Sequence, residues 1–324
     1  MRVLVTGGSG FIGTNMIDRL RAEGYTEILN IDIKAPRDER QNAYWHQCDI
    51  LDLEHLKREI QAFQPELVVH LAAKTGLTRA NLECYAENTT GVRNMLEVLK
   101  ATPSVRRVIF TSTLLVCQMG YIPKHDTDYK PNTLYGESKM IGEKIVREAR
   151  DLAFEWIIIR PISIWGPWGE EPYINFFRSI KQGWYFHIGS GHYRRSLGYV
   201  ENAVYSLHKL LTAPAEQVVG KTFYIADYDP ADLYLMANEI RSQLQARRIF
   251  HVPLTPVKVM AKLGDVLRNR GWENVPLQSF RLKNIMTEYV FDMTPLRCVT
   301  GDLPYTLPQG VSRTIAQLRQ NNRL

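Results

Sequence analysis

Short apolar runs alternate with longer amphipathic stretches over the first two thirds of the chain. The apolar runs are rich in Val, Ile and Leu, which is typical of strands that are buried on both faces. Because such strands normally belong to a parallel sheet covered by helices, the pattern predicts an α/β fold. The runs that we interpret as strands are residues 2–6, 27–33, 67–70, 108–111, 156–160 and 221–226.

Helical periodicity fills the intervals between these runs. It is clearest at residues 11–20, where apolar side chains recur at intervals of three and four before Gly24. Further helices are expected at residues 53–62, 85–100 and 134–150. Strands and helices in this order predict a doubly wound parallel sheet with helices on both faces.

The alternation becomes irregular after about residue 165, where Trp, Pro and Gly are frequent. One more strand and a helix ending near residue 246 follow, and then only scattered short elements. We therefore expect a sheet domain at residues 1–165, to which residues 199–227 return. Residues 166–198 and 228–324 are expected to form a smaller C-terminal lobe that binds the substrate.

The composition of the 324 residues, with 45% apolar and 23% charged, excludes a disordered chain or a coiled coil. The net charge is +6, but the basic residues are scattered, so we expect no nucleic-acid partner. No segment approaches the ~18 to 20 apolar residues that span a bilayer, and no secretory signal is evident. Four widely spaced cysteines without a CxxC pair give no metal site. We expect a cytoplasmic protein with no membrane partner.

A glycine-rich segment, TGGSGFIG at residues 6–13, joins the first strand to the first helix. Gly7 permits a tight turn, Gly10 lets the backbone approach a pyrophosphate, and Gly13 lets the helix pack closely on the sheet. The N-terminus of the helix supplies N–H donors to the phosphates. The motif therefore predicts a Rossmann-type dinucleotide-binding domain.

Asp32 follows Gly13 by 19 residues, at the end of the second expected strand. A carboxylate at this place accepts hydrogen bonds from the adenosine ribose and repels a 2′-phosphate, which favours NAD. Lys34 and Arg37 follow closely and leave NADP open as an alternative. Asp49, just beyond a short strand, is interpreted either as an adenine contact or as a turn residue.

Tyr135 and Lys139 stand four residues apart at the start of the helix at 134–150, so they share one face. A phenol, with an ordinary pKa of about 10, is a poor base, but a nearby ammonium and an oxidised nicotinamide favour the phenolate. Thr111 and Thr113 lie at the C-terminal end of a strand, where open α/β sheets bind ligands. These groups predict proton transfer coupled to hydride transfer.

With these motifs the chain resembles the extended short-chain dehydrogenases, and specifically the NAD-dependent epimerase/dehydratase family acting on nucleotide sugars. The resemblance covers nearly the whole length. It is carried by TGGSGFIG, HLAA at 70–73, ENTTGVRNMLE at 87–97, FTST at 110–113, YGESK at 135–139, IIIRPISIWGP at 157–167 and YVENAV at 199–204.

The resemblance implies that Tyr135 is the general acid/base, that Lys139 binds the nicotinamide ribose and that Thr113 is the hydroxyl partner. It also implies a homodimer packed through the helices at 85–100 and 134–150. The expected contacts to the cofactor, NAD, are Gly7, Gly10, Phe11, Ile12, Gly13, Asp32, Asp49, Ile50, Leu71, Ala72, Ala73, Asn88, Thr111, Tyr135, Lys139, Pro161 and Ile164.

The chain departs from the family directly after Thr113. The 4,6-dehydratases have an Asp-Glu pair there and decarboxylating members keep a Glu, whereas this chain has Leu114 and Leu115. Without a carboxylate, proton abstraction at C5 has no evident base, so neither dehydration nor decarboxylation is expected. The usual Val-Tyr-Gly is replaced by Val-Cys-Gln at residues 116–118, which leaves the substrate open.

Three residues of the expected lobe are candidates to contact a nucleotide-diphosphate sugar, together with Thr113 and Tyr135. Arg195 matches a diphosphate-binding arginine of the family, and Arg281 a second one with looser alignment; either is also interpretable as a surface arginine. Tyr289 falls near a position that limits the room for an N-acetyl group, although a half-buried strand tyrosine is the simpler interpretation.

The leading prediction is a nucleotide-sugar epimerase that oxidises and re-reduces the sugar C4 hydroxyl through a 4-keto intermediate. The alternatives are a 4-keto-sugar reductase or related alcohol dehydrogenase, in which the cofactor exchanges at each turnover, and a non-catalytic NAD-sensing module. The sequence leaves the nucleotide and the sugar open.

Overall fold

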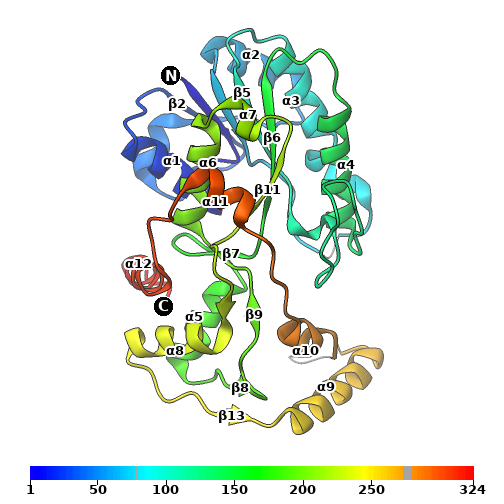
Figure 1. The fold of residues 1–324 in the computed structure, drawn as a ribbon, viewed down its shortest axis with the longest axis vertical. Coiled ribbons are helices and arrows are strands. Elements are labelled where there is room, and N and C mark those ends of the chain that lie inside the picture. The colour runs from blue at the N-terminus through cyan, green and yellow to red at the C-terminus, as the bar shows by residue number, and fades with distance from the viewer. Residues whose placement is uncertain (78, 273–278) are drawn as a thin grey trace.

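A seven-stranded parallel sheet forms the centre of the larger part of the molecule, which we describe from a computed structural model covering residues 1–77, 79–272 and 279–324 (Figure 1). The strand order reverses between β1 and β4, as in a doubly wound Rossmann-type sheet. The predicted fold class is confirmed. Across the sheet the strands are β11 (Thr222–Ile225), β6 (Glu155–Pro161), β5 (Arg107–Thr111), β4 (Leu67–His70), β1 (Val3–Thr6), β2 (Ile28–Asp32) and β3 (Trp45–Gln47).

Helices cover both faces of this sheet. On β1, Val3 and Val5 pack with one set of helices and Leu4 with the other, because successive side chains point to opposite faces. The apolar runs are continuous for this reason. One face carries α1 (Phe11–Ala22), α6 (Val200–Thr212), α7 (Ala215–Val218) and α11 (Thr294–Thr300), and the other α2 (Leu53–Phe63), α3 (Thr90–Lys100) and α4 (Leu134–Glu148).

The helix expected at residues 85–100 is divided in two, so that prediction was wrong in its first part. A 3-10 segment, η2 (Leu82–Asn88), is separated from α3 by Thr89, whose φ of −123° and ψ of −72° are not helical. The Asn88 amide donates to the Lys74 carbonyl and to Ser138 Oγ, both at 2.9 Å, and its oxygen accepts from Lys74 N at 2.9 Å. Such side-chain bonds compete with a continuous helix.

The smaller lobe lies below the sheet in Figure 1 and has its own core. Trp165, Phe177 and Tyr199 are buried in it, against α8 (Leu233–Leu244) and α12 (Leu307–Gln320). Its elements are β7 (Ile164–Trp165), α5 (Tyr173–Gln182), β8 (His187–Ile188), β9 (Arg194–Arg195), β10 (Gly198–Tyr199), β12 (Ala231–Asp232), α8 (Leu233–Leu244), β13 (His251–Val252), α9 (Leu254–Asn269), α10 (Ser279–Met286) and α12 (Leu307–Gln320). Two further 3-10 segments of the sheet part are η1 (Glu39–Tyr44) and η3 (Leu114–Val116).

The chain crosses between the two parts more often than the sequence predicted. Strand β11 joins the main sheet beside β6, within the expected return at residues 199–227. Later, Tyr289, Phe291, Met293 and Leu296 pack in the core under the sheet, although they fall within the span 228–324 assigned to the lobe. This second crossing places Tyr289 where the two parts meet.

Candidate active site

The candidate site begins at the C-terminal ends of β1, β4 and β5, where the strand order reverses. Thr6 ends β1 and His70 ends β4, and Thr6 Oγ1 lies 2.7 Å from His70 Nδ1. Both residues are buried. A crevice at such a reversal is the usual ligand site of an open α/β sheet.

The glycine-rich turn has the geometry of a phosphate cradle. Gly7 has a φ of +73°, and a Cβ atom on it would lie 2.6 Å from Ala72 N. A Cβ on Gly13 would lie 2.2 Å from the Gly7 carbonyl oxygen, so α1 packs against the turn only without a side chain there. Gly10 precedes α1 as its N-cap, and the N–H groups of Phe11 and Ile12 emerge from the helix end. The residues present therefore fit a pyrophosphate.

Asp32 lies at the end of β2, directly against this turn. Its Oδ2 accepts from Ser9 N at 3.0 Å and its Oδ1 from Lys34 N at 3.0 Å. Burial raises the pKa of its carboxyl, while these two bonds lower it. A carboxylate held by backbone N–H groups beside the cradle fits an adenosine ribose.

Arg37, one of the two basic residues that kept NADP as an alternative cofactor, forms hydrogen bonds within the protein. Its guanidinium donates to the Ser9 carbonyl at 3.1 Å, to the Trp168 carbonyl at 3.0 Å and to the carboxylate of Glu170. These contacts tie the turn to the loop after β7. The structure thus gives Arg37 partners within the protein rather than leaving it free for a 2′-phosphate.

Other expected cofactor contacts lie around the same crevice. Asp49 is exposed just past β3, and its Oδ1 accepts a hydrogen bond from Leu51 N at 2.9 Å, as expected for a turn residue. The next residue, Ile50, is buried. The Asn88 amide is occupied by Lys74 and Ser138, as described above. The remaining expected contacts directly follow β4, end β5 or β6, or begin β7, and all are partly buried: Leu71, Ala72, Ala73, Thr111, Pro161 and Ile164.

Tyr135 and Thr113 are brought together by the packing of α4 on η3. A Cβ on Gly136 would lie 2.0 Å from the Leu115 carbonyl oxygen, so the first turn of α4 approaches η3 as closely as glycine permits. Burial raises the pKa of Tyr135 to about 12, and a hydrogen bond with Thr113 opposes this rise. The tyrosine is therefore a phenol at neutral pH, able to donate a proton.

Lys139 lies one helical turn beyond Tyr135 and is buried. Burial lowers the pKa of its ammonium to about 8, while Glu143 acts in the opposite direction. At neutral pH the ammonium form therefore predominates. An ammonium whose pKa lies close to neutral pH, beside a phenol, fits an acid–base pair.

The residues that pack around Tyr135 and Lys139 and hold them in place were not predicted from the sequence. Tyr85 is fully buried, its ring lies 6.1 Å from that of Tyr135, and its hydroxyl donates to the Gly76 carbonyl at 2.6 Å. Glu143 accepts two hydrogen bonds from the buried Arg160, at 2.8 and 2.7 Å. The spacing of Glu143, four residues after Lys139, could have been noticed in the sequence. Its partner Arg160 on β6 could not, because the two lie far apart in the chain.

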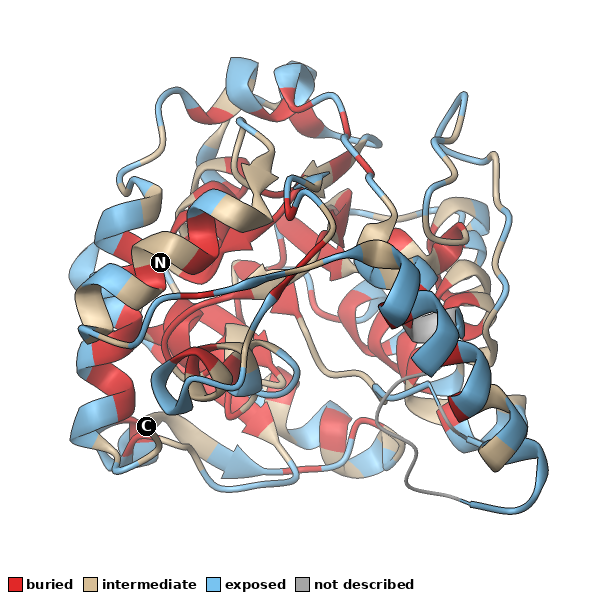
Figure 2. Ribbon diagram, turned by 90° about the horizontal axis from the view of Figure 1, so that it is seen from below, coloured by how far each residue is buried: buried red, intermediate tan, exposed pale blue. Residues whose placement is uncertain are grey.

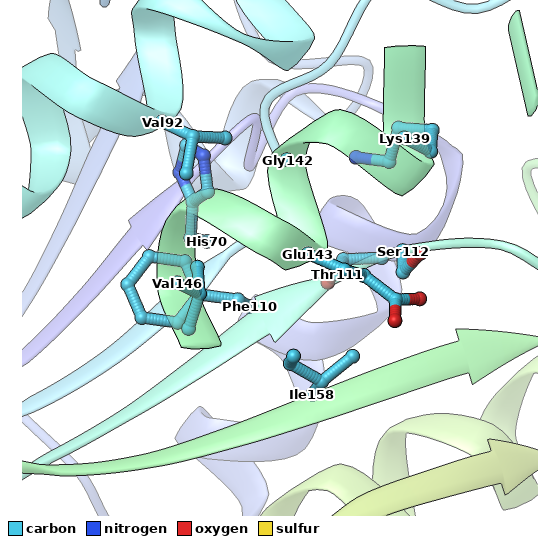
Figure 3. A pocket seen from close by; sticks show the side chains of 10 residues that line it. All are labelled: His70, Val92, Phe110, Thr111, Ser112, Lys139, Gly142, Glu143, Val146 and Ile158. Carbon is cyan, nitrogen blue, oxygen red and sulfur yellow. The ribbon is translucent and has the colours of Figure 1, made fainter. Parts of the chain in front are cut away.

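A small cavity lined by apolar side chains and a few polar groups lies beside Lys139 (Figure 3). Its volume of about 10 Å³ is room for about one water molecule. In Figure 3 His70 and Phe110 lie on one side of it and Lys139 and Ser112 on the other. His70 Nε2 and the hydroxyls of Thr111 and Ser112 are buried without a hydrogen-bond partner among the described residues. Burial and the Lys139 charge lower the pKa of His70 to about 3, so the ring is neutral.

On the lobe side, Arg195 and Tyr289 lie together where the parts meet. Arg195 lies over the Tyr289 ring at 5.3 Å and donates to the carbonyls of Asn284, Ile285 and Thr287 at the end of α10. The Tyr289 hydroxyl lies 2.9 Å from Ser163 Oγ. Arg281 lies in α10, but its side chain is outside the part that the structure describes.

The chain has known relatives that match it along nearly its whole length. The chain is 25% identical to an N-acetyl-α-D-glucosaminyl-diphospho-ditrans,octacis-undecaprenol 4-epimerase of Escherichia coli O157:H7, over 97% of this chain and 94% of that one. It is 24% identical to a 2-alkyl-3-oxoalkanoate reductase of Stenotrophomonas maltophilia, over 97% and 98% of the two chains.

The fold is similar to that of the UDP-glucose 4-epimerase of Thermotoga maritima solved with UDP-glucose. The TM-score is 0.75 at 21% identity, and the match covers 99% of this chain and 100% of that one. Residues 3–226 match the NAD dependent epimerase/dehydratase family. The chain therefore belongs to the NAD dependent epimerase/dehydratase family and is an NAD-dependent enzyme.

Proposed function

We propose that this protein is a 4-epimerase of a sugar carried on a diphosphate. The observation that carries the proposal is the close packing of the first turn of α4 on η3, which brings Tyr135 beside Thr113, with Lys139 one turn away, at the strand ends beside the glycine-rich cradle. The relatives named above include epimerases of a UDP-linked sugar and of a lipid-linked diphosphate sugar. We therefore leave the carrier open at this step.

In the proposed reaction, Thr113 accepts or donates a hydrogen bond at the sugar O4 and orients the hydroxyl toward Tyr135. Once NAD is bound, the Lys139 ammonium and the positive nicotinamide favour the phenolate of Tyr135; this phenolate takes the O4 proton as the carbon becomes a ketone, and the phenol so formed returns it when the opposite face is reduced. Lys139 holds the nicotinamide ribose and, as an ammonium, favours the phenolate of Tyr135 while the proton is away. Bound NAD supplies the hydride acceptor and then the donor.

The residues that follow Thr113 support epimerisation over elimination. Leu114 is buried, and the segment from Leu114 to Gln118 contains no carboxylate. A dehydratase must remove a proton from carbon, which needs a base next to the sugar. The site therefore supports chemistry at one carbinol carbon.

The contacts of Arg37 and Asp32 support a cofactor that stays bound between turnovers. Arg37 joins the glycine-rich turn to the loop at Trp168 and Glu170, and Asp32 sits beneath that turn. An epimerase returns its hydride within one turnover and needs no exchange. We also retain a homodimer packed through α3 and α4 as part of this proposal.

A reductase is the second candidate, because the 2-alkyl-3-oxoalkanoate reductase matches over nearly the whole chain. The two reactions share the proton donor and differ in the fate of the hydride. A reductase consumes one NADH or NADPH for each ketone reduced, whereas an epimerase consumes none.

The decisive experiment measures both the bound cofactor and the origin of the hydrogen at C4 of the product. We would denature the purified protein, identify released nucleotide by chromatography, and incubate the intact protein with UDP-hexoses in D₂O without added cofactor. Near-stoichiometric NAD, with inversion at C4 and no deuterium at that carbon, is the expected result. The Tyr135→Phe variant is the matched control and is expected to retain NAD without turnover. Absence of inversion together with steady NAD(P)H consumption on a ketone would reject the epimerase in favour of the reductase.

A further inference from the structure

Helix α9 carries an apolar stripe on the face that it turns away from the protein. Its inner side, with Val257 and Ala261, packs on α10 and β8. The side chains of Val259, Leu263 and Val266, which are spaced by four and three residues, form a second stripe opposite the inner one. The outer apolar residues, including one just beyond the helix, are each 47% to 63% exposed: Val259, Met260, Leu263, Val266 and Trp272.

Positive charge is concentrated in the same segment. Residues 254–286 contain six basic and two acidic residues, a net +4 out of the +6 of the whole chain. Lys258 and Lys262 stand one turn apart on α9 and share a groove of about 340 Å³ with Lys283 of α10. The groove also has hydroxyls from Ser279 and Thr287 and an apolar floor.

This surface lies at the end of the lobe farthest from the sheet, as Figure 1 shows, and α9 is drawn largely in pale blue in Figure 2. No described helix is long and apolar enough to cross a bilayer. An amphipathic helix with exposed aliphatic and tryptophan side chains, flanked by lysines, is instead the arrangement that lies in a membrane interface.

We propose that the outer face of α9 and the lysine groove beside it dock this enzyme on an anionic membrane surface. Charge complementarity selects this occupant. A second copy placed face to face would oppose Lys258, Lys262 and Lys283 to their own equivalents, because such a contact is self-complementary. Anionic headgroups attract the lysines while the aliphatic side chains enter the boundary of the acyl chains.

The docking face is continuous with the candidate active site. Arg195 binds three carbonyls at the C-terminal end of α10, and the other end of α10 is held to α9 by Ser279 N donating to Asp265 at 3.1 Å. A diphosphate whose lipid stays in the membrane reaches the candidate active site along α10, past Arg195, which these carbonyls hold in place. This consequence rests on the proposed function, and it selects a lipid-linked sugar diphosphate as the substrate class. It is an alternative to the sequence-based expectation of no membrane partner, which considered only spanning segments.

The test measures flotation of the full chain with vesicles of phosphatidylcholine alone and of equal parts phosphatidylcholine and phosphatidylglycerol. We expect the protein to float with the anionic vesicles only, and to be released by high salt. Val259→Glu combined with Leu263→Glu is expected to abolish flotation. Val219→Glu, a charge placed on an exposed apolar residue of the sheet domain, is the control and is expected to float normally.

A second pair of variants tests the charge. Lys258→Ala with Lys262→Ala is expected to weaken binding to anionic vesicles on the order of tenfold, since each lysine near the surface contributes. Lys57→Ala, on the exposed side of α2, is the control. The amount of bound NAD and the midpoint of thermal unfolding are expected to be unchanged in all four variants, which shows that they are folded.

Three outcomes would overturn the docking surface. These are no flotation of the unmodified protein, flotation of the α9 variants equal to that of their controls, or conversion of a dimer to a monomer by the Val259→Glu and Leu263→Glu pair in size-exclusion chromatography. The last outcome would show that a second copy covers α9. Anionic flotation by a protein that inverts no sugar would instead leave the surface intact and reject the proposed function.

Discussion

Glu143 and Arg160 are joined by two hydrogen bonds inside the protein, one turn of α4 beyond Lys139. Oε1 accepts from Nε at 2.8 Å and Oε2 from Nη2 at 2.7 Å, and both side chains are almost completely buried. Tyr129 donates a further bond to Glu143 at 2.9 Å. The pair thus places a compensated negative charge beside the lysine of the candidate acid–base pair.

The Glu143→Gln variant should lose both stability and alkaline activity. It leaves the Arg160 charge buried without its carboxylate, which is expected to lower the free energy of unfolding by about 3 kcal/mol. Because Glu143 raises the pKa of Lys139, its removal lowers that pKa. We expect kcat to fall as Lys139 loses its proton, and this fall should occur at lower pH in the variant. Denaturant titration and a pH profile of kcat measure the two effects. Glu148→Gln, exposed at the end of α4, should change neither.

The Thr113→Val variant tests the hydroxyl partner of Tyr135. Loss of the hydrogen bond removes the one influence from Thr113 that lowers the pKa of Tyr135, so the phenolate becomes harder to form. We expect kcat to fall about 100-fold or more, as when a transition-state hydrogen-bond donor is removed. NAD content should be unchanged, since Thr113 is not at the phosphate cradle. Turnover equal to that of the unmodified protein would exclude Thr113 from catalysis.

The Asp32→Asn variant tests the choice of NAD. Replacing the carboxylate weakens its bonds to the ribose hydroxyls and removes the repulsion of a 2′-phosphate, so NAD affinity should fall about tenfold to 100-fold while NADP gains. Fluorescence titration with both nucleotides gives the ratio. Arg37→Ala is the informative companion. If Arg37 contacted a 2′-phosphate, this variant would lose NADP; because Arg37 is engaged with Ser9, Trp168 and Glu170, we expect no such loss.

Two glycines of the same turn should respond differently to alanine. A Cβ on Gly13 meets the Gly7 carbonyl at 2.2 Å, so Gly13→Ala is expected to destabilise the whole sheet domain by several kcal/mol, about the range of an overpacked core. A Cβ on Gly10 meets the same oxygen at 3.1 Å, so Gly10→Ala should fold and instead lose NAD. Thermal unfolding with and without NAD separates the two. Equal loss of stability in both variants would contradict this assignment.

Much of the sheet and part of the candidate site could be predicted from the sequence, because those features depend on local pattern. Strands buried on both faces are uninterrupted apolar runs, and β4 was predicted at its observed residues. The glycine spacing marks a turn whose backbone geometry admits no side chain at Gly7 or Gly13. Tyr135 and Lys139 share a helix face because four residues make about one turn.

What only the tertiary structure decided depends on contacts between residues far apart in the chain. Arg160 lies on a strand next to β5 and reaches Glu143 because β6 and α4 pack together, which no local spacing reveals. Asn88 interrupts a helix that its neighbours favour, because Lys74 and Ser138 bind its amide. The apolar residues on the outer face of α9 have the spacing that a buried helix would also show. Leu263 is exposed because α9 lies at the end of the lobe, which the sequence does not reveal. Local pattern determines which elements form, and packing determines which of their faces meet.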